Sequence, residues 1–417
     1  MDTIYFYIKH LNKTVLYLSY DGMTDPLGQS QVLPYLRGIS KAGYNVHLVS
    51  YEKPDQLKKH RKVIDLFCKE ASIKWHFQDY SSQGGLISTL KQIKRMKKIT
   101  MYLHEKHNFD IVHCRSYISA LAGLILKRKS EVKFVFDMRG FWADERVDGK
   151  LWDLNKPLFK LIYRFFKKKE IQFFKEADYT ISLTENGKNE IESWPEFSAK
   201  KPRIKIIPCC VDLNLFDPSK ITEQAKKNLK DELEIKPDDF VLGYVGSIGT
   251  WYMLDEMLDY FKVLKSKNNK AIFLFITGEN ELTIMEKAIQ KGINPESVKI
   301  KSVLHKEVPL HISIFDNSVF FIRSTYSKKA SSPTKQGEIM AMGIPLICNA
   351  GIGDTDSIVK KYNAGEIVTE FSDVSYLNIV SHQIKFDINE TIRGAQEYFS
   401  LDEGIRRYLS IYSEIYE

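Results

Sequence analysis

Residues 331–345 read SSPTKQGEIMAMGIP, a pattern that predicts a short helix followed directly by a buried strand. Ser332 is a favourable N-cap, Pro333 suits the first helical position, and a glycine followed by a proline ends the helix. At its start, the unpaired amides of Thr334 and Lys335 and the Lys335 ammonium coincide with the positive end of the helix dipole. The stretch therefore predicts a site for a phosphate or a diphosphate.

Glu338 follows Lys335 by one turn, so the predicted helix places both side chains on one face. Its carboxylate can accept hydrogen bonds from the vicinal hydroxyls of a ribose. An ordinary solvent-facing Lys–Glu pair is the alternative interpretation of these two residues.

The loop YVGSIGTW, residues 244–251, follows the first predicted strand of the second half. Gly246 and Ser247 stand where folds of this kind bring the backbone close to a ligand phosphate. Arg323, just after the predicted strand VFFI, adds a cation at the same edge of the sheet. The chain contains neither a GxGxxG fingerprint in this loop nor a GxxxxGK[ST] motif, which disfavours NAD-dependent hydride transfer and P-loop chemistry.

Short apolar runs alternate with longer segments of helical period along nearly the whole chain, which is typical of parallel sheets flanked by helices. The predicted strands of the first half are 14–19, 44–50, 111–113, 132–136, 179–182 and 204–207. Those of the second half are 240–245, 271–277, 298–300, 319–322, 345–348 and 365–368. We therefore expect an α/β protein with two doubly wound, Rossmann-like domains, as a length of 417 residues allows.

The polar segment 216–239 between the two series carries no buried-strand pattern, so we expect a linker with a peripheral helix there. Residues 1–215 then form an N-terminal domain, and residues 240–395 form a C-terminal domain across a cleft. Residues 396–417 are predicted to form a helix that packs back on the body of the first domain.

Composition excludes several classes of protein. Hydrophobic residues make up 43% and charged residues 27% of the chain, which is ordinary for a packed protein and excludes a disordered chain. No window reaches the ~18 apolar residues of a membrane span, and charged residues interrupt the N-terminal stretch, so neither a signal peptide nor an anchor is expected. The five cysteines lack zinc-type spacing, which predicts buried thiols in a reducing cytoplasm.

In the first half, the loop YDGMTDPLGQSQ, residues 20–31, leads from a predicted strand into a helix that begins near Gln29. Gly28 can let the backbone approach a phosphate or a sugar, and a plain strand-to-helix turn is the alternative. Asp21 and Asp25 are candidates for capping or for contact with an acceptor.

A second loop, FDMRGFWADE at residues 136–145, follows another buried strand. Asp137, Arg139 and Glu145 lie at the edge of the sheet where open α/β folds bind ligands. A salt bridge of Arg139 with Asp137 or Glu145 that only holds the loop is the alternative. His113, which ends the neighbouring strand, favours a structural role.

The chain resembles the retaining glycosyltransferases of family 4, the glycosyl transferases group 1, which have the two-lobed GT-B fold. The resemblance covers most of the chain. It rests on LYLSYDGMTDPLGQSQVLPYLRGISKAGYNVHLVS at 16–50, IIPCCVDLNLF at 206–216, LGYVGS at 242–247, SPTKQGEIMAMGIPLI at 332–347 and GDTDSIVKKYNAGEIV at 353–368.

This resemblance implies that the second lobe binds a UDP- or GDP-linked sugar, with Glu338 on the ribose and Lys335 near the diphosphate. The other expected donor contacts are Gly28, Gly246, Ser247, Arg323 and Thr334. Asp137 matches the strand end that often carries a histidine near the reacting carbon, and with Arg139 and Glu145 it forms the expected catalytic group. No metal or cofactor is implied, because cations and the helix dipole can neutralise the leaving diphosphate.

We therefore expect a glycosyltransferase that moves a sugar to a hydroxyl of a surface glycan or a lipid-linked acceptor, with retention at the anomeric carbon. The family's common signature has a glutamate eight residues before the position of Glu338, where this chain has Ala330. An inactive family member that serves as a binding subunit is therefore one alternative. A nucleotide-sugar epimerase on the same scaffold is another.

The segment 156–175, KPLFKLIYRFFKKKEIQFFK, interleaves aromatic rings with Lys160, Arg164, Lys167, Lys168 and Lys169. A basic amphipathic helix of this kind suits peripheral attachment to anionic lipid at the inner face of the plasma membrane. A core helix with a solvated face is the alternative. The net charge of +8 is not accompanied by a groove-reading or RNA-binding motif, so a nucleic-acid partner is not expected.

Overall fold

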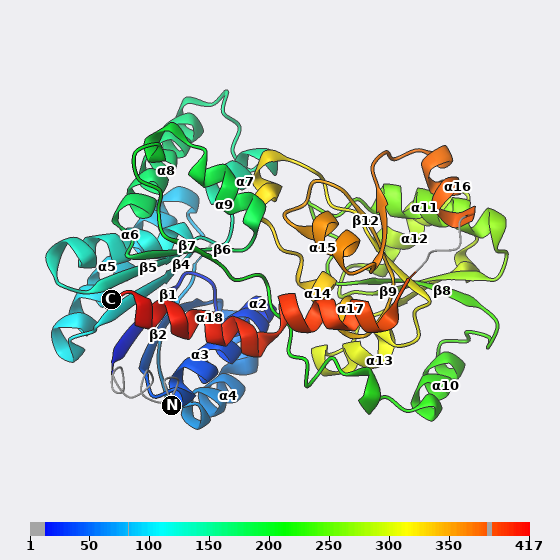
Figure 1. The fold of residues 1–417 in the computed structure, drawn as a ribbon, viewed down its shortest axis with the longest axis horizontal. Coiled ribbons are helices and arrows are strands. Elements are labelled where there is room, and N and C mark those ends of the chain that lie inside the picture. Colours follow the sequence, from blue (N-terminus) through cyan, green and yellow to red (C-terminus); the bar gives the residue numbers. More distant parts are fainter. Residues whose placement is uncertain (1–12, 82, 382–385) are drawn as a thin grey trace. The chain divides into compact units, whose positions relative to one another are not determined.

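The computed structural model describes residues 13–81, 83–381 and 386–417, which form two compact units (Figure 1). Unit 1 contains the described residues up to Pro208 together with Leu401–Glu417, and unit 2 is Cys209–Ser400. Each unit is built around one parallel sheet flanked by helices, so the predicted doubly wound α/β fold is confirmed.

The sheet of unit 1 has the strand order β3-β2-β1-β4-β5-β6-β7, and every neighbouring pair is parallel. Its strands are β1 (Thr14–Ser19), β2 (Asn45–Glu52), β3 (Ile73–Asp79), β4 (Ile111–Arg115), β5 (Lys133–Asp137), β6 (Tyr179–Ser182) and β7 (Ile204–Ile206). The order reverses between β1 and β4, and open sheets of this type bind ligands beside such a switch point.

The helices of unit 1 cover both faces of this sheet. They are α2 (Pro26–Gln31), α3 (Leu33–Lys41), α4 (Pro54–Glu70), α5 (Gly85–His107), α6 (Ser116–Lys129), α7 (Trp142–Asp148), α8 (Pro157–Glu176), α9 (Glu185–Glu192) and α18 (Leu401–Glu414), with the short turn η1 (Pro195–Phe197). As expected, α18 returns to the first unit, where it packs along α3 (Figure 1). Ile405 of α18 lies against Gly38, where even a methyl group would clash.

Strand β3 is missing from the predicted set. Its sequence, IKWHFQD, alternates apolar and polar residues, and only Ile73 is buried because β3 is the last strand at one edge of the sheet. Strands that are covered on both faces form short apolar runs, and the predicted strands rest on such runs. In β3 a polar residue follows each apolar one, so the strand has no such run.

The sheet of unit 2 has the order β10-β9-β8-β11-β12-β13, again with parallel neighbours and a reversal between β8 and β11. Its strands are β8 (Phe240–Val245), β9 (Ala271–Ile276), β10 (Val298–Lys301), β11 (Asn317–Phe320), β12 (Leu346–Asn349) and β13 (Gly365–Val368). All six strands predicted for the second half are present, with small shifts of their bounds.

The helices of unit 2 are α10 (Glu223–Glu232), α11 (Leu254–Lys267), α12 (Glu281–Gln290), α13 (Val308–Ile312), α14 (Thr334–Ala341), α15 (Thr355–Lys361), α16 (Asp373–Ser381) and α17 (Ile388–Gly394), with the short turns η2 (Pro218–Lys220), η3 (Pro295–Ser297), η4 (His305–Glu307), η5 (Tyr326–Ala330) and η6 (Ala395–Phe399). Helix α10 lies in the segment 216–239 that the sequence assigns to a linker. Its Leu229, with Leu233 just after it, belongs to the apolar core of unit 2.

All five cysteines are buried, as expected, and none forms a disulfide. Among the described residues, no helix combines the length and the apolar character needed to cross a membrane.

Three histidines of unit 1 lie together: His47 of β2, His76 of β3 and His107 at the end of α5. His47 Nδ1 lies 3.1 Å from His76 Nε2, and the ring centroids of His47 and His107 are 4.4 Å apart. Burial lowers the pKa of His47 to about 3, and repulsion by His107, His76 and Lys74 contributes to this shift. The folded state therefore favours the neutral form of His47.

This cluster predicts that the protein loses stability on acidification. Because the pKa of His47 is lower in the folded state than its ordinary value of 6.5, the unfolded state binds more protons as the pH falls below that value. We expect the free energy of unfolding, measured with urea, to fall by about 2 kcal/mol between pH 7 and pH 5 through this group. His47→Gln should reduce this pH dependence, and an unchanged dependence in that variant would contradict the assignment.

Candidate functional site

In unit 2, the loop after β8 is fastened to the segment after β11, on the two sides of the switch point. Tyr252 forms an isolated antiparallel bridge with Ile322, and the Arg323 amide donates to the Trp251 carbonyl at 2.9 Å. These backbone contacts fix the positions of the aromatic residues of the loop and of Arg323.

Helix α14 begins one residue later than predicted. Pro333 occupies the N-cap position with an extended ψ of 117°, so Thr334 is the first helical residue. Ser332 does not cap the helix; its hydroxyl accepts a hydrogen bond from the Cys209 amide at 3.2 Å. The fixed φ of proline suits either position, which is why the sequence alone did not distinguish them.

Lys335 of α14 points into the protein beneath the loop after β8. Its Nζ donates to Tyr244 Oη at 2.8 Å and lies 3.6 Å from the centre of the Tyr252 ring. Gly246, at φ +103°, comes so close that an added Cβ would lie 3.2 Å from this nitrogen. The structure therefore brings Lys335 and Gly246 together, as the sequence predicts for a phosphate site.

Two opposing effects act on the protonation of Lys335. Aromatic faces attract an ammonium group, whereas burial disfavours any charge. Burial is the larger effect and places the pKa of Lys335 well below its ordinary value, although Glu338 raises it in part. A phosphate group beside Nζ would raise the pKa again, because an opposite charge stabilises the ammonium form.

Glu338 reaches the surface at the same place. Its side chain is 12% exposed, and Oε1 lies 3.5 Å from His305 Nε2. Burial raises the pKa of Tyr252 to about 12, and Cys209 and Glu338 add to the shift. The contribution of Glu338 shows that its carboxylate lies near the Tyr252 ring, which covers Lys335. Thr334, at the start of α14, is half-buried.

Arg323 is exposed and lines a pocket of about 400 Å³ together with Tyr252, Glu279 and residues at the starts of α11 and α12. Ser247 is also exposed, and its carbonyl accepts a hydrogen bond from Tyr244 Oη. Both residues lie at the carboxyl edge of the sheet, as predicted.

A second buried lysine of unit 2 was not singled out from the sequence. Lys328 Nζ lies 3.7 Å from the centre of the Trp251 ring, and Ala330, two residues later, is fully buried. Nothing in the local sequence distinguishes Lys328 from its exposed neighbour Lys329.

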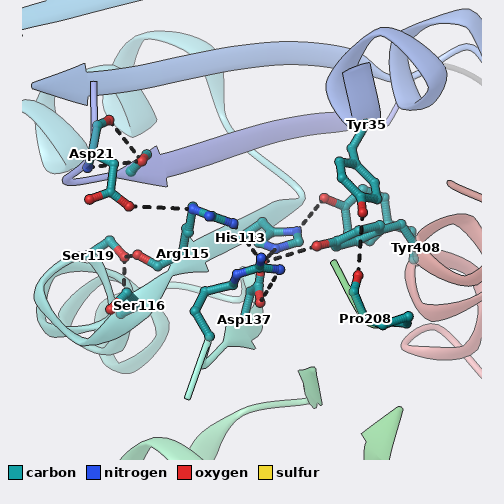
Figure 2. Close-up of polar contacts among 12 residues, drawn as sticks. Asp21, Tyr35, His113, Arg115, Ser116, Ser119, Asp137, Pro208 and Tyr408 are labelled. Atoms are coloured by element: carbon teal, nitrogen blue, oxygen red, sulfur yellow. Dashed lines mark hydrogen bonds and ion pairs between the residues drawn. The ribbon is translucent and has the colours of Figure 1, made fainter. Parts of the chain in front are cut away.

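In unit 1, the side chain of Asp137 is fully buried at the end of β5 (Figure 2). Tyr408 Oη donates to Asp137 Oδ2 at 3.1 Å, and His113 Nε2 lies 3.7 Å from the same oxygen. Arg115 Nη1 is 3.9 Å from Oδ2, and Arg139 Nη1 is 3.9 Å from Oδ1. The Asp137–Arg139 ion pair considered above is thus present, within a larger cluster from β4, β5 and α18.

The two arginines and His113 keep Asp137 ionised. Burial by itself would raise the pKa of this carboxyl, but Arg139, His113 and Arg115 outweigh burial and lower it. Among the described residues, Asp137 Oδ1 and Arg115 Nη1 have no hydrogen-bond partner. Buried polar atoms left unsatisfied are rare and often mark a functional site.

Backbone strain occurs at the same edge of the sheet. Arg139 has φ +59° and Ser116 has φ +67°, and these residues follow the neighbouring strands β5 and β4. Non-glycine residues in the left-handed region are uncommon and concentrate at functional sites.

Glu145 and Gly28 lie on two helices of unit 1, α7 and α2. Glu145 lies on α7 next to Asp144, and it is Asp144 that binds Tyr163 Oη and Lys167 Nζ, each at 2.8 Å. Gly28 lies inside α2, which begins at Pro26 rather than near Gln29. A Cβ on Gly28 would lie 2.2 Å from the carbonyl oxygen of Gly22 in the preceding loop. Close packing therefore explains why this position holds a glycine.

Glu52 is a buried residue that the sequence analysis missed. At the end of β2, its carboxylate accepts hydrogen bonds from the amides of Met23 and Thr24, at 2.8 and 3.0 Å, and so holds the loop after β1. The available signal was an acidic residue at the end of an apolar strand. Asp21 in the same loop places Oδ2 3.5 Å from Arg115 Nε.

Helix α8 differs in part from its predicted role. Lys167 does not face solvent freely, because it pairs with Asp144 and with the buried Glu170. Lys169 is half-buried and donates to Gln172, and burial lowers its pKa. Six exposed residues in the first three turns and a half of the helix are named here the α8 surface: Leu158, Lys160, Leu161, Arg164, Phe165 and Lys168.

Comparison with known protein families matches residues 30–215 to Glycosyltransferase Family 4 and residues 225–380 to Glycosyl transferases group 1. No curated protein sequence matches the chain. Similar solved structures include a glycosyltransferase from Rickettsia africae and a sucrose-phosphate synthase from Thermosynechococcus elongatus, each with 14% identity, a TM-score of 0.70 and coverage of 97% of this chain and 99% of the other.

The Anabaena protein HepE in complex with UDP and glucose is another, with 13% identity, a TM-score of 0.67 and coverage of 96% of this chain and 99% of the other. At these identities the likeness shows the fold, and the two family matches together span most of the chain. The chain is therefore a glycosyltransferase of the GT-B fold, and it belongs to the family 4 and group 1 glycosyltransferases.

Proposed function

We propose that this protein transfers a sugar from a UDP- or GDP-linked donor to a hydroxyl of a surface glycan or a lipid-linked acceptor, with retention of the anomeric configuration. The observation that carries the donor assignment is the buried amine of Lys335, which lies beside the backbone of Gly246 at the start of α14. The UDP and glucose bound to the similar HepE structure support the same class of donor.

In unit 2 the leaving diphosphate would meet Lys335 and the first amides of α14, including that of Thr334. Because burial lowers the pKa of Lys335, a bound diphosphate would favour its ammonium form, and this positive charge would lie where negative charge develops in the transition state. Glu338, one turn further on, would accept hydrogen bonds from the ribose hydroxyls. Arg323 and Ser247 lie at the same edge and supply further polar contacts.

In unit 1, Asp137 would act on the acceptor or on the donor sugar. An ionised carboxylate can orient the attacking hydroxyl and can stabilise positive charge that develops on the sugar. Arg115 and Arg139 keep this carboxylate charged at neutral pH. Glu145 remains a candidate for a supporting role on α7.

A thermal-shift screen with UDP, GDP and their sugar conjugates tests the donor class, since a ligand that binds only the native state raises its stability. Release of free nucleotide in the presence of an acceptor separates a transferase from an inactive binding subunit. Conversion of the donor without any acceptor would instead favour an epimerase.

Lys335→Ala and Glu338→Gln should each weaken UDP or GDP binding by about tenfold or more, because charge-assisted hydrogen bonds are lost. Binding to the wild type should also take up a proton, since the diphosphate raises the lowered pKa of Lys335, and affinity should therefore fall as the pH rises. Calorimetry in buffers with different ionisation enthalpies measures both effects. Lys262→Ala on the exposed face of α11 is the control, and unchanged affinity in both site variants would refute the site.

Asp137→Asn should lower kcat by about 100-fold and change the donor KM little, which is the pattern of an interaction made mainly in the transition state. The rate of nucleotide release at saturating donor measures the effect. Asp144→Asn, which removes a carboxylate paired with Lys167, is the matched control. If Asp137→Asn loses stability while turnover per folded molecule is preserved, the ion pair is merely structural.

We further propose that the α8 surface attaches unit 1 to anionic membrane at the cytoplasmic face. Leu158, Leu161 and Phe165 are 55%, 67% and 46% exposed and alternate with cations along the same helix. Apolar side chains can enter the headgroup region while the cations meet lipid phosphates. A lipid-linked acceptor would then be within reach of the enzyme.

Co-sedimentation with phosphatidylserine vesicles should fall as salt rises, because each basic residue near the surface is worth ~1 kcal/mol of screened attraction. Changing Lys160, Arg164 and Lys168 to Glu should abolish binding and leave UDP binding intact. The charge-matched control changes Lys58, Lys59 and Lys62 on α4, which are also exposed. Equal binding to neutral vesicles, or equal loss in the control, would contradict the proposal.

A further inference from the structure

Two buried tyrosines of α18 reach the polar cluster around Asp137. Tyr408 donates to Asp137 Oδ2 at 3.1 Å, and Tyr412 Oη lies 2.7 Å from His113 Nδ1. The two tyrosines are four residues apart, so they lie on one face of the helix, and both are buried. Hydroxyls of α18 thus contact both Asp137 and His113, and Figure 2 shows Tyr408 beside these two residues.

The protonation of this chain of groups follows from burial and charge. Burial lowers the pKa of His113, so its imidazole is neutral and has one N–H donor and one acceptor nitrogen. The ionised Asp137 can only accept, and its negative charge 3.7 Å from Nε2 favours the tautomer of His113 that carries the proton on that nitrogen. His113 Nδ1 is then the acceptor, and Tyr412, whose pKa burial raises well above its ordinary value, donates to it.

We infer that Tyr408 and Tyr412 are positioning residues for the reaction: Tyr408 holds the Asp137 carboxylate, and Tyr412 fixes His113 as the tautomer that faces this carboxylate. The inference rests on the proposed role of Asp137 in transfer.

Other ionisable groups face the same carboxylate and set its charge independently of α18. Tyr17 comes from β1, Arg115 from β4 and Arg139 from the loop after β5. The arginines would keep Asp137 ionised without the tyrosines. Removal of a tyrosine hydroxyl should therefore change the orientation and the pKa of Asp137 or His113 rather than the net charge of the cluster.

The first test needs no substrate. In the full chain labelled with 15N-histidine, long-range 1H–15N correlation spectra report the tautomer of each histidine, and His113→Gln assigns the signal. We expect wild-type His113 to carry its proton on Nε2 throughout pH 5.5–8. Tyr412→Phe keeps the ring and removes the donor, so the Nδ1 resonance should move downfield and the single tautomer should be lost.

Tyr179→Phe is the matched control, because Tyr179 Oη binds Glu414 Oε2 of the same helix at 2.9 Å, away from Asp137. This variant should leave the His113 signals unchanged. Unchanged signals in Tyr412→Phe, or an equal change in Tyr179→Phe, would overturn the role of Tyr412 and leave only a general effect of α18 docking.

The second test addresses Tyr408 with UDP-glucose as the probe. Tyr408→Phe should lower kcat for UDP release by about tenfold, with KM within twofold, and should shift the acidic limb of the kcat profile to higher pH, because the ionised carboxylate loses a donor. Tyr179→Phe should match the wild type. An unshifted limb in Tyr408→Phe would overturn its role. If wild-type protein releases no UDP, the proposed donor fails, whereas the histidine spectra still decide the inference.

Discussion

The common direction of the strands is the constraint on which the rest of the structure depends. In a parallel sheet all the carboxyl ends lie along one edge, and at the point where the strand order reverses the loops on either side turn away from each other. Unit 1 reverses between β1 and β4, and unit 2 between β8 and β11. The cluster around Asp137 and the cluster around Lys335 both form beside these points.

The two clusters manage a buried charge in opposite ways. Asp137 lies within 4 Å of cationic side chains, so its charge exists before any ligand arrives. Lys335 is surrounded by the rings of Tyr244 and Tyr252, and burial suppresses its charge. The fold therefore stabilises the charge of Asp137, whereas it disfavours a charge on Lys335. Preorganised charge favours catalysis because it needs no rearrangement during the reaction.

The strands covered on both faces could be predicted because burial demands short apolar runs, and the loops after them could be predicted because those ends share an edge. Strand β3 was not predicted, because polar residues alternate with its apolar residues. The ion pairs of Lys167 with Asp144 and Glu170 were not predicted either. Helical periodicity does not reveal the charge of a residue on an adjacent element. Tyr408 illustrates the same limit: its apolar spacing predicted that α18 would pack, but the partner of its hydroxyl lies 271 residues away.

The return of α18 to unit 1 makes that unit discontinuous in the chain. During synthesis on the ribosome, the strands of unit 1 emerge first, but residues 401–417 emerge only after all of unit 2. Until then, Gly38 lacks its covering side chain from Ile405, and Asp137 and His113 lack their tyrosine partners. The nascent first unit therefore exposes the face of α3 that α18 later covers, and a chain released before residue 401 would carry the sheet without this helix.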